Sequence, residues 1–148
     1  MRVPRSGSYR VFLIWIALTL GMTACSMVQV APYDPNTMDS LQSIDQHIDK
    51  LYLTMLTLPE QKRTYQHFSS DYLNLQVMIR ALVRMQQYRD NNAETLKQSQ
   101  LLAKLWAQGM HLHQKKGVLP DFMIRLRQSQ YQRLLATMMK GESYKPRS

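Results

Sequence analysis

The chain has one cysteine among its 148 residues and is also poor in glycine and proline. A single cysteine excludes an internal disulfide framework and any zinc site of the Cys-x-x-Cys kind. With five glycines and six prolines, the sequence is neither collagen-like nor of low complexity. Hydrophobic residues make up 45% of the chain, which excludes global disorder.

Acidic residues and long apolar runs are scarce as well. Ten acidic residues stand against 19 basic ones, which gives a formal net charge of +9. A mean hydropathy of -0.37 excludes a membrane protein with many spans. The length of the chain predicts one domain.

Residues 1–25 have the organisation of an export signal. The basic start contains three arginines, Arg2, Arg5 and Arg10. An apolar run of ten residues follows at 11–20. It has the length of a signal-peptide apolar region and is too short to cross a bilayer, which needs about 20 residues. The small residues Thr23 and Ala24 then stand directly before Cys25.

The stretch Met22-Thr23-Ala24-Cys25 resembles the lipobox of bacterial lipoproteins, although leucine is commoner where Met22 stands. The resemblance implies diacylglyceryl transfer to the thiol of Cys25, removal of residues 1–24, and acylation of the new N-terminus. Ser26 implies sorting to the outer membrane, with the mature chain facing the periplasm. The alternative is an uncleaved N-terminal anchor with an incidental cysteine.

Four domain segments are expected. Residues 1–24 are the signal peptide, and residues 25–35 form an acylated cysteine and extended tether, because they contain two prolines and no helical period. Residues 36–141 form helices, with Asn36 as the first N-cap, and residues 142–148 form a polar tail.

Between 36 and 141 the apolar residues recur at alternating spacings of three and four, as on one face of a helix. This pattern predicts helices over 36–58, 65–88, 92–116 and 120–141. The expected core residues are Leu41, Ile44, Ile48, Leu51, Met55, Leu58, Tyr65, Phe68, Tyr72, Leu75, Ile79, Leu82, Leu102, Leu105, Trp106, Leu112, Phe122, Ile124, Leu126, Tyr131, Leu134, Leu135 and Met138.

The fold class expected from this pattern is all-α. Short connections favour antiparallel neighbours and therefore a four-helix bundle in up-down-up-down order. The alternative is a three-helix core whose remaining helix docks on a partner. The tripeptide Tyr33-Asp34-Pro35 followed by such helices resembles uncharacterised short bacterial envelope proteins, which carry no activity to transfer.

Residues that carry chemistry do not form a recognisable site in the sequence. His111 and His113 are two apart and would lie on opposite sides of a helix, so one metal ion cannot bind both. His47 and His67 lie on other predicted helices, without a Glu-x-x-His pattern. The sequence also contains no Gly-x-Ser-x-Gly pattern around a serine nucleophile and no glycine-rich phosphate-binding loop. We therefore expect no enzyme activity, cofactor or metal, and exposed or boundary histidines.

Methionine is abundant, and two interpretations stay open. These residues either fill gaps in the core or line an adaptable groove. The methionines concerned are Met78, Met85, Met110, Met123, Met138 and Met139.

Positive charge is concentrated in the second half of the chain. Residues 31–58 have a net charge of -3, and residues 96–148 have a net charge of +8. This asymmetry predicts that an acidic helix lies beside a basic one, or that a basic surface binds anions. The expected anion-binding residues are Lys115, Lys116, Arg125, Arg127 and Arg133. Its ligand would be anionic lipid, a cell-wall polymer or an acidic partner protein, and not nucleic acid, because we expect the chain to be exported. A solvated cationic face is the alternative.

These observations predict an outer-membrane lipoprotein that acts as a non-catalytic binding or accessory module with an envelope protein partner. Two alternatives remain open. The protein is a small subunit of an envelope machine, such as a secretion or conjugation apparatus, or it binds polyanions in the envelope. An exposed apolar patch would favour the first alternative.

Overall fold

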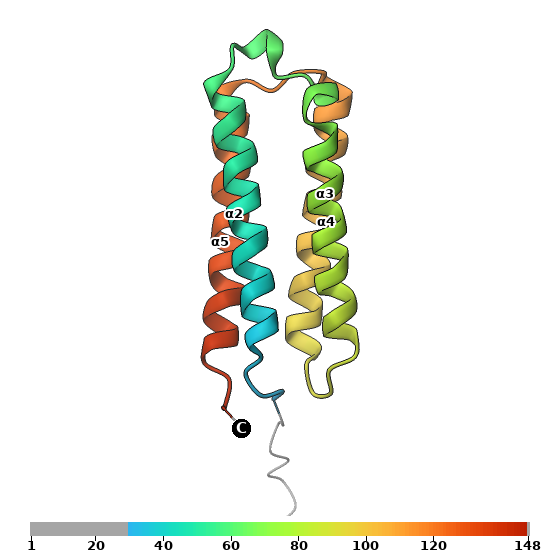
Figure 1. Ribbon diagram of the computed structural model, residues 1–148, viewed down its shortest axis with the longest axis vertical. Helices are drawn as coiled ribbons and strands as arrows, with labels where there is room; N and C mark the ends of the chain where they lie inside the picture. Colours follow the sequence, from blue (N-terminus) through green and yellow to red (C-terminus); the bar gives the residue numbers. More distant parts are fainter. Residues whose placement is uncertain (1–29, 148) are drawn as a thin grey trace, which may run out of the picture.

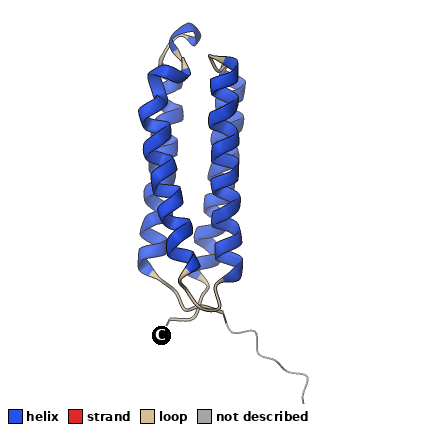
Figure 2. Ribbon diagram, turned by 90° about the vertical axis from the view of Figure 1, so that its right-hand side faces the viewer, coloured by secondary structure: helices blue, strands red, loops and turns tan. Residues whose placement is uncertain are grey.

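The computed structural model describes residues 30–147, which fold into an antiparallel four-helix bundle (Figures 1 and 2). Its helices are α2 (Pro35–Thr57), α3 (Tyr65–Gln87), α4 (Ala93–Lys116) and α5 (Asp121–Ser143), with a short 3-10 turn, η1 (Glu60–Lys62), after α2. The expected all-α bundle is confirmed. The predicted signal peptide, Cys25 and Ser26 lie outside the described residues.

Each helix packs against two others. Helix α2 contacts α3 and α5, and α4 contacts the same two helices from the opposite corner. All four helices are therefore part of one bundle, and the alternative of a three-helix core is excluded. The acidic helix α2 does lie beside the basic helix α5, as the charge pattern predicted.

The two ends of the bundle are different. The end in the lower part of Figure 1 contains the entering chain, the α3–α4 turn and the chain after α5. We call this the terminal end and define it as residues 30–34, 88–92 and 144–147. The far end consists of the α2–α3 and α4–α5 connections, residues 58–64 and 117–120.

The N-terminus of α2 differs from the prediction by two residues. Asp34, and not Asn36, is the N-cap: its carboxylate accepts hydrogen bonds from the amides of Asn36 and Thr37. Pro35 occupies the first turn, where its missing N–H costs nothing and its fixed φ suits the helix. Gly117 ends α4 with a φ of 80°, as its predicted position after the helix requires.

The C-terminus of α5 also differs from the prediction. The helix continues through Gly141 to Ser143, so the first part of the expected polar tail is helical. Glu142 lies in this extra turn and is 1% exposed. Its burial continues the stripe of Leu135 and Met138 at the same helical spacing.

The core contains most of the predicted apolar residues, with tyrosines and Trp106 among its largest buried side chains. Two residues of α5 were predicted wrongly, because Phe122 is 69% exposed and Leu126 is 53% exposed. Each is two positions from the buried Ile124, which is a rotation of about 200° around a helix. They therefore face solvent.

Replacing a core residue by a charged one should unfold the protein. A buried leucine or isoleucine contributes about 1.5–3 kcal/mol, and an unpaired buried carboxylate adds a further cost. We expect Leu51→Asp and Ile79→Asp to abolish the helical circular dichroism signal of the purified protein.

The controls are Leu53→Asp and Val77→Asp on the same helices, where the native residues are 52% and 56% exposed. Both should keep the native spectrum and nearly the native melting temperature. Equal losses in core and control variants would contradict the packing described here.

Candidate functional site

A closed ring of polar side chains joins all four helices at the terminal end. Four hydrogen bonds follow one another: Lys145 donates to Asn92, Asn92 to Gln86, Gln86 to Thr37, and Thr37 to Asp34, over 2.6–2.9 Å. The ring closes through Glu142, whose Oε1 accepts from the amide of Asp34 at 2.9 Å and whose Oε2 lies 2.6 Å from Nζ of Lys145. We call Asp34, Thr37, Gln86, Asn92, Glu142 and Lys145 the polar ring.

Arg89 lies against the polar ring and balances its charge. Its Nη1 is 3.5 Å from Glu142 and 3.9 Å from Asp34, and it donates to Thr37. Burial alone would raise the pKa of Asp34, but hydrogen bonds from Thr37 and Asn36 and the charge of Arg89 outweigh it and lower the pKa. The buried Glu142 and the half-buried Asp34, Arg89 and Lys145 thus form a cluster in which two carboxylates are compensated by two cations.

The polar ring fixes the chain that enters the bundle. The amide of Asp34 donates to Glu142, as described above. In addition, the amide of Ala31 donates to the carbonyl of Asn91 at 3.0 Å, and the amide of Tyr33 donates to the carbonyl of Pro146 at 2.9 Å. Ala31 is 2% exposed. The described part of the expected tether is therefore docked on the bundle and belongs to the folded body.

A second buried polar group, His113, lies among aromatic rings near the far end. Its Nε2 is 2.9 Å from the carbonyl of Arg63, which can only accept, so Nε2 carries the proton. Nδ1 then accepts from the hydroxyl of Tyr72 at 3.0 Å. The expectation of an exposed or boundary histidine is wrong here, because His113 is fully buried.

Burial shifts the proton affinity of this aromatic cluster. It lowers the pKa of His113, with partial compensation by the hydrogen bond to Arg63. Burial also raises the pKa of Tyr131 to about 12, against the opposing charge of Arg127. Both nitrogens of His113 have hydrogen-bond partners, and the hydroxyl of Tyr131 donates to the carbonyl of Leu105. These bonds join different segments of the bundle, so the cluster holds the helices together.

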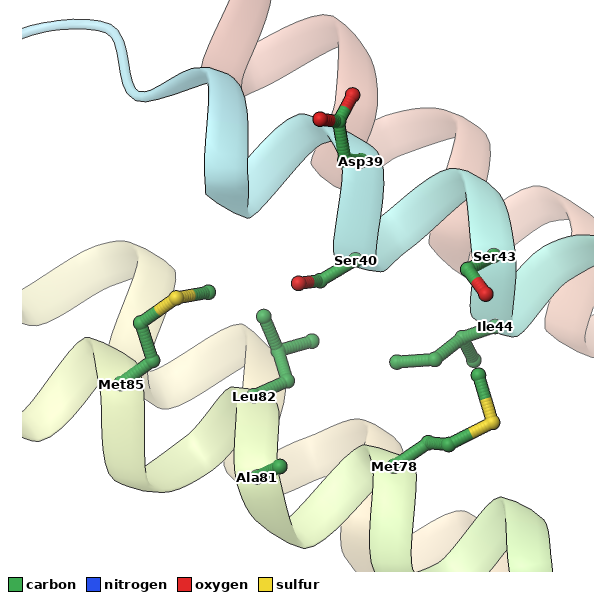
Figure 3. Close-up of a pocket in the computed structure, with 8 residues that line it drawn as sticks. All are labelled: Asp39, Ser40, Ser43, Ile44, Met78, Ala81, Leu82 and Met85. Carbon is green, nitrogen blue, oxygen red and sulfur yellow. The ribbon is translucent and has the colours of Figure 1, made fainter.

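An open groove lies between α2 and α3 (Figure 3). Its volume is about 390 Å³. Leu82 and Met78 extend from α3 toward α2, and Asp39 points away from α3 at the rim. The lining residues are Asp39, Ser40, Ser43, Ile44, Met78, Ala81, Leu82 and Met85. Met78 and Met85 therefore line a groove, whereas Met138 fills the core.

An exposed apolar stripe on α3 adjoins this groove. Leu73 is 59% exposed, and Val77 is 56% exposed. Together with Ala81 they recur every fourth residue and follow one side of the helix. Two exposed bases, Arg80 and Arg84, lie on the same side of α3, three residues after Val77 and Ala81. We call the groove, the stripe and these two arginines the α3 face.

The five predicted anion-binding residues do not form one patch. Lys115 and Lys116 end α4 and Arg125 lies in the second turn of α5, so these three exposed residues share the far end. Arg127 is half-buried and donates to Gln130. Arg133 lies eight residues after Arg125 on α5, which is about 12 Å along the helix axis at 1.5 Å per residue.

The sequence analysis missed the polar ring and the buried histidine. The helical spacing of both residues indicates burial. Glu142 continues the buried stripe of α5, and His113 lies seven residues, or about two helical turns, after the buried Trp106. Polar residues on an apolar stripe were not counted as core. Within residues 30–147 no helix has the length and apolar character of a membrane span, and no three metal-ligating side chains gather.

Comparison with known proteins adds no assignment. No protein-family model, curated protein or solved structure matches the chain.

The buried His113 predicts an acid-sensitive fold. Its pKa is lowered in the folded state, so below the ordinary value of 6.5 the unfolded chain binds a proton that the folded chain does not. We expect the free energy of unfolding to fall as the pH decreases from 7 to 5. Unfolding in denaturant over this range measures the fall.

Two variants separate His113 from the other histidines. His113→Gln should lower the free energy of unfolding at neutral pH and make it depend less on pH between 7 and 5. His47 is exposed, so His47→Gln should change neither the free energy of unfolding nor its pH dependence. A wild-type profile that is flat between pH 7 and 5 would contradict the assignment.

Proposed function

We propose that this protein is a lipid-anchored, non-catalytic binding module of the bacterial envelope, attached to the outer membrane and facing the periplasm. The observation that carries the proposal is the position of Cys25, the sole cysteine, directly after Met22-Thr23-Ala24 and a short apolar run. Two or three acyl chains on Cys25 would hold the protein on a membrane, since one chain alone binds only marginally.

The α3 face supports a role in protein binding. An apolar groove between two helices receives the apolar side of a partner helix, a common mode of recognition. Asp39 at the groove and Arg80 and Arg84 beside the stripe favour a partner that carries charges of both signs next to its apolar stripe. This combination fits a small accessory subunit of a larger envelope assembly.

Replacing Cys25 tests the anchor. Cys25→Ser removes the acylated thiol, so lipid attachment and cleavage before residue 25 should both fail. We expect loss of labelling by a fatty-acid analogue and persistence of a precursor that begins at Met1. A wild-type protein that is unlabelled and begins at Met1 would refute the lipoprotein assignment.

Photo-crosslinking in intact cells tests the α3 face. A photoreactive amino acid at position 77 or 81 should give one discrete adduct, and Ala81→Arg should reduce adduct formation from position 77 severalfold. Positions 53 and 126 are controls on other helices with similarly exposed apolar residues. Equal adducts at all four positions would argue against a specific docking surface.

Anion binding is a second candidate function, supported by the far end. Lys115, Lys116 and Arg125 gather there, at the opposite end from the entering chain. A protein anchored through residue 25 would present this end to the cell-wall polymer, whose carboxylates carry the opposite charge. The binding would be electrostatic and would weaken with salt.

Charge removal tests this candidate. The variant with Lys115, Lys116, Arg125 and Arg127 replaced by Gln should bind isolated cell-wall sacculi several times more weakly. A matched control replaces the exposed Arg80, Arg84, Lys97 and Lys104 by Gln and removes the same charge elsewhere. Equal weakening in both variants, or wild-type binding that is insensitive to salt, would exclude a specific anion site.

A further inference from the structure

We propose that the terminal end of the bundle rests on the lipid surface, with Tyr88 and Tyr144 at the level of the headgroups. This inference depends on the proposed function, because it takes Cys25 as the point of lipid attachment. It goes beyond that function by assigning a membrane-contact surface and an orientation to the folded body.

Covalent geometry brings the terminal end close to the anchor. Val30 is five residues from Cys25, and an extended chain spans at most about 3.5 Å per residue, so the distance between them is below about 18 Å. From Ala31 onward the chain is bound to the bundle by hydrogen bonds to Asn91, Pro146 and Glu142. The far end is displaced by the length of α2, about 35 Å at 1.5 Å per residue.

The exposed side chains of the terminal end suit a membrane interface. Tyr88 is 88% exposed, Tyr144 is 77% exposed and Val30 is 53% exposed. The two tyrosines are the C-caps of α3 and α5, diagonal helices that both end at the terminal end (Figure 1). The entering chain is hydrogen-bonded to the segment that follows each of them. Tyrosine is enriched at the headgroup level because its ring is apolar and its hydroxyl stays hydrated.

Basic side chains lie beside aromatic rings at this end. Nζ of Lys140 is 5.9 Å from the ring centre of Tyr144, and the guanidinium of Arg147 is 5.4 Å from that of Tyr33. Long basic side chains place their stems against apolar material and their charge in the headgroup layer. Both bases are exposed.

Overall charge does not attract the terminal end to lipid. The bases Arg89, Lys140, Lys145 and Arg147 are matched by the acids Asp34, Asp90, Glu94 and Glu142. The contact therefore rests on Tyr88, Tyr144 and Val30, and should change little with salt. This separates it from the electrostatic binding expected of the far end.

Depth measurements on the lipidated protein test the inference. The full chain is expressed with Tyr88→Cys or Tyr144→Cys, spin-labelled at the new thiol, and reconstituted in vesicles of phosphatidylethanolamine and phosphatidylglycerol. Acylation leaves Cys25 without a free thiol. Phe122→Cys is the control, because Phe122 is an exposed aromatic residue at the opposite end of the bundle.

Oxygen concentrates in lipid and the nickel complex in water, so we expect the ratio of oxygen to nickel collisions to be severalfold higher for labels at 88 and 144 than for the label at 122. Raising the salt should leave this difference unchanged. Labels at 88 and 144 that are as water-accessible as the label at 122 would overturn the inference. A label at 122 that also enters the lipid would overturn it too, because the bundle would then lie flat.

The mass of the N-terminal peptide distinguishes this failure from failure of the proposed function. An acylated Cys25 with labels in water refutes only the membrane contact. An unmodified Cys25 refutes the anchor and with it this inference. Circular dichroism verifies the fold of each variant, and Val30→Cys replaces either tyrosine position if that variant does not fold.

Discussion

The burial of Glu142 constrains the whole terminal end of the molecule. An ionised carboxylate away from water is costly unless charges and hydrogen bonds compensate it. Lys145, Arg89 and the amide of Asp34 provide this compensation, and they come from the C-terminal segment, from the chain after α3, and from the start of α2. These parts of the chain must therefore meet at one place, which brings the polar ring together and docks residues 31–34 on the bundle.

Because residues 31–34 are docked, the terminal end is the part of the folded body that lies nearest to residue 25 along the chain. A free tether would let the bundle turn in any direction. A docked segment places the terminal end nearest the proposed anchor and directs Lys115, Lys116 and Arg125 away from it. The α3 face runs along the side of the bundle between these two ends, where a partner helix would reach it without displacing the anchor.

Helical periodicity was sufficient to predict the fold but insufficient to predict the site. The stripe from Leu41 to Met55 and the one from Phe68 to Leu82 are buried as expected, because apolar residues at spacings of three and four leave one face for the core. On α5 the apolar residues are less regular, and Phe122 and Leu126 were assigned to the wrong face. Pro35 favours the first helical position, which makes Asp34 rather than Asn36 the residue before the helix.

Polar residues in the core were not predicted because their burial depends on partners distant in sequence. The polarity of Glu142 suggests a solvated tail until Lys145, Arg89 and the amide of Asp34 surround it. His113 is buried only because the Arg63 carbonyl and the Tyr72 hydroxyl satisfy both of its nitrogens. Local sequence patterns contain no information on such pairings, and a three-dimensional arrangement of the helices is needed to reveal them.

Hydrogen exchange of backbone amides, resolved residue by residue by nuclear magnetic resonance, measures whether residues 31–34 belong to the folded body. We expect the amides of Ala31, Tyr33 and Asp34 to exchange far more slowly than those of an unstructured chain, because each donates a hydrogen bond to the bundle. Glu142→Gln should accelerate exchange at Asp34. Exchange of all three amides at the rate of an unstructured chain would contradict the docked segment and the orientation derived from it.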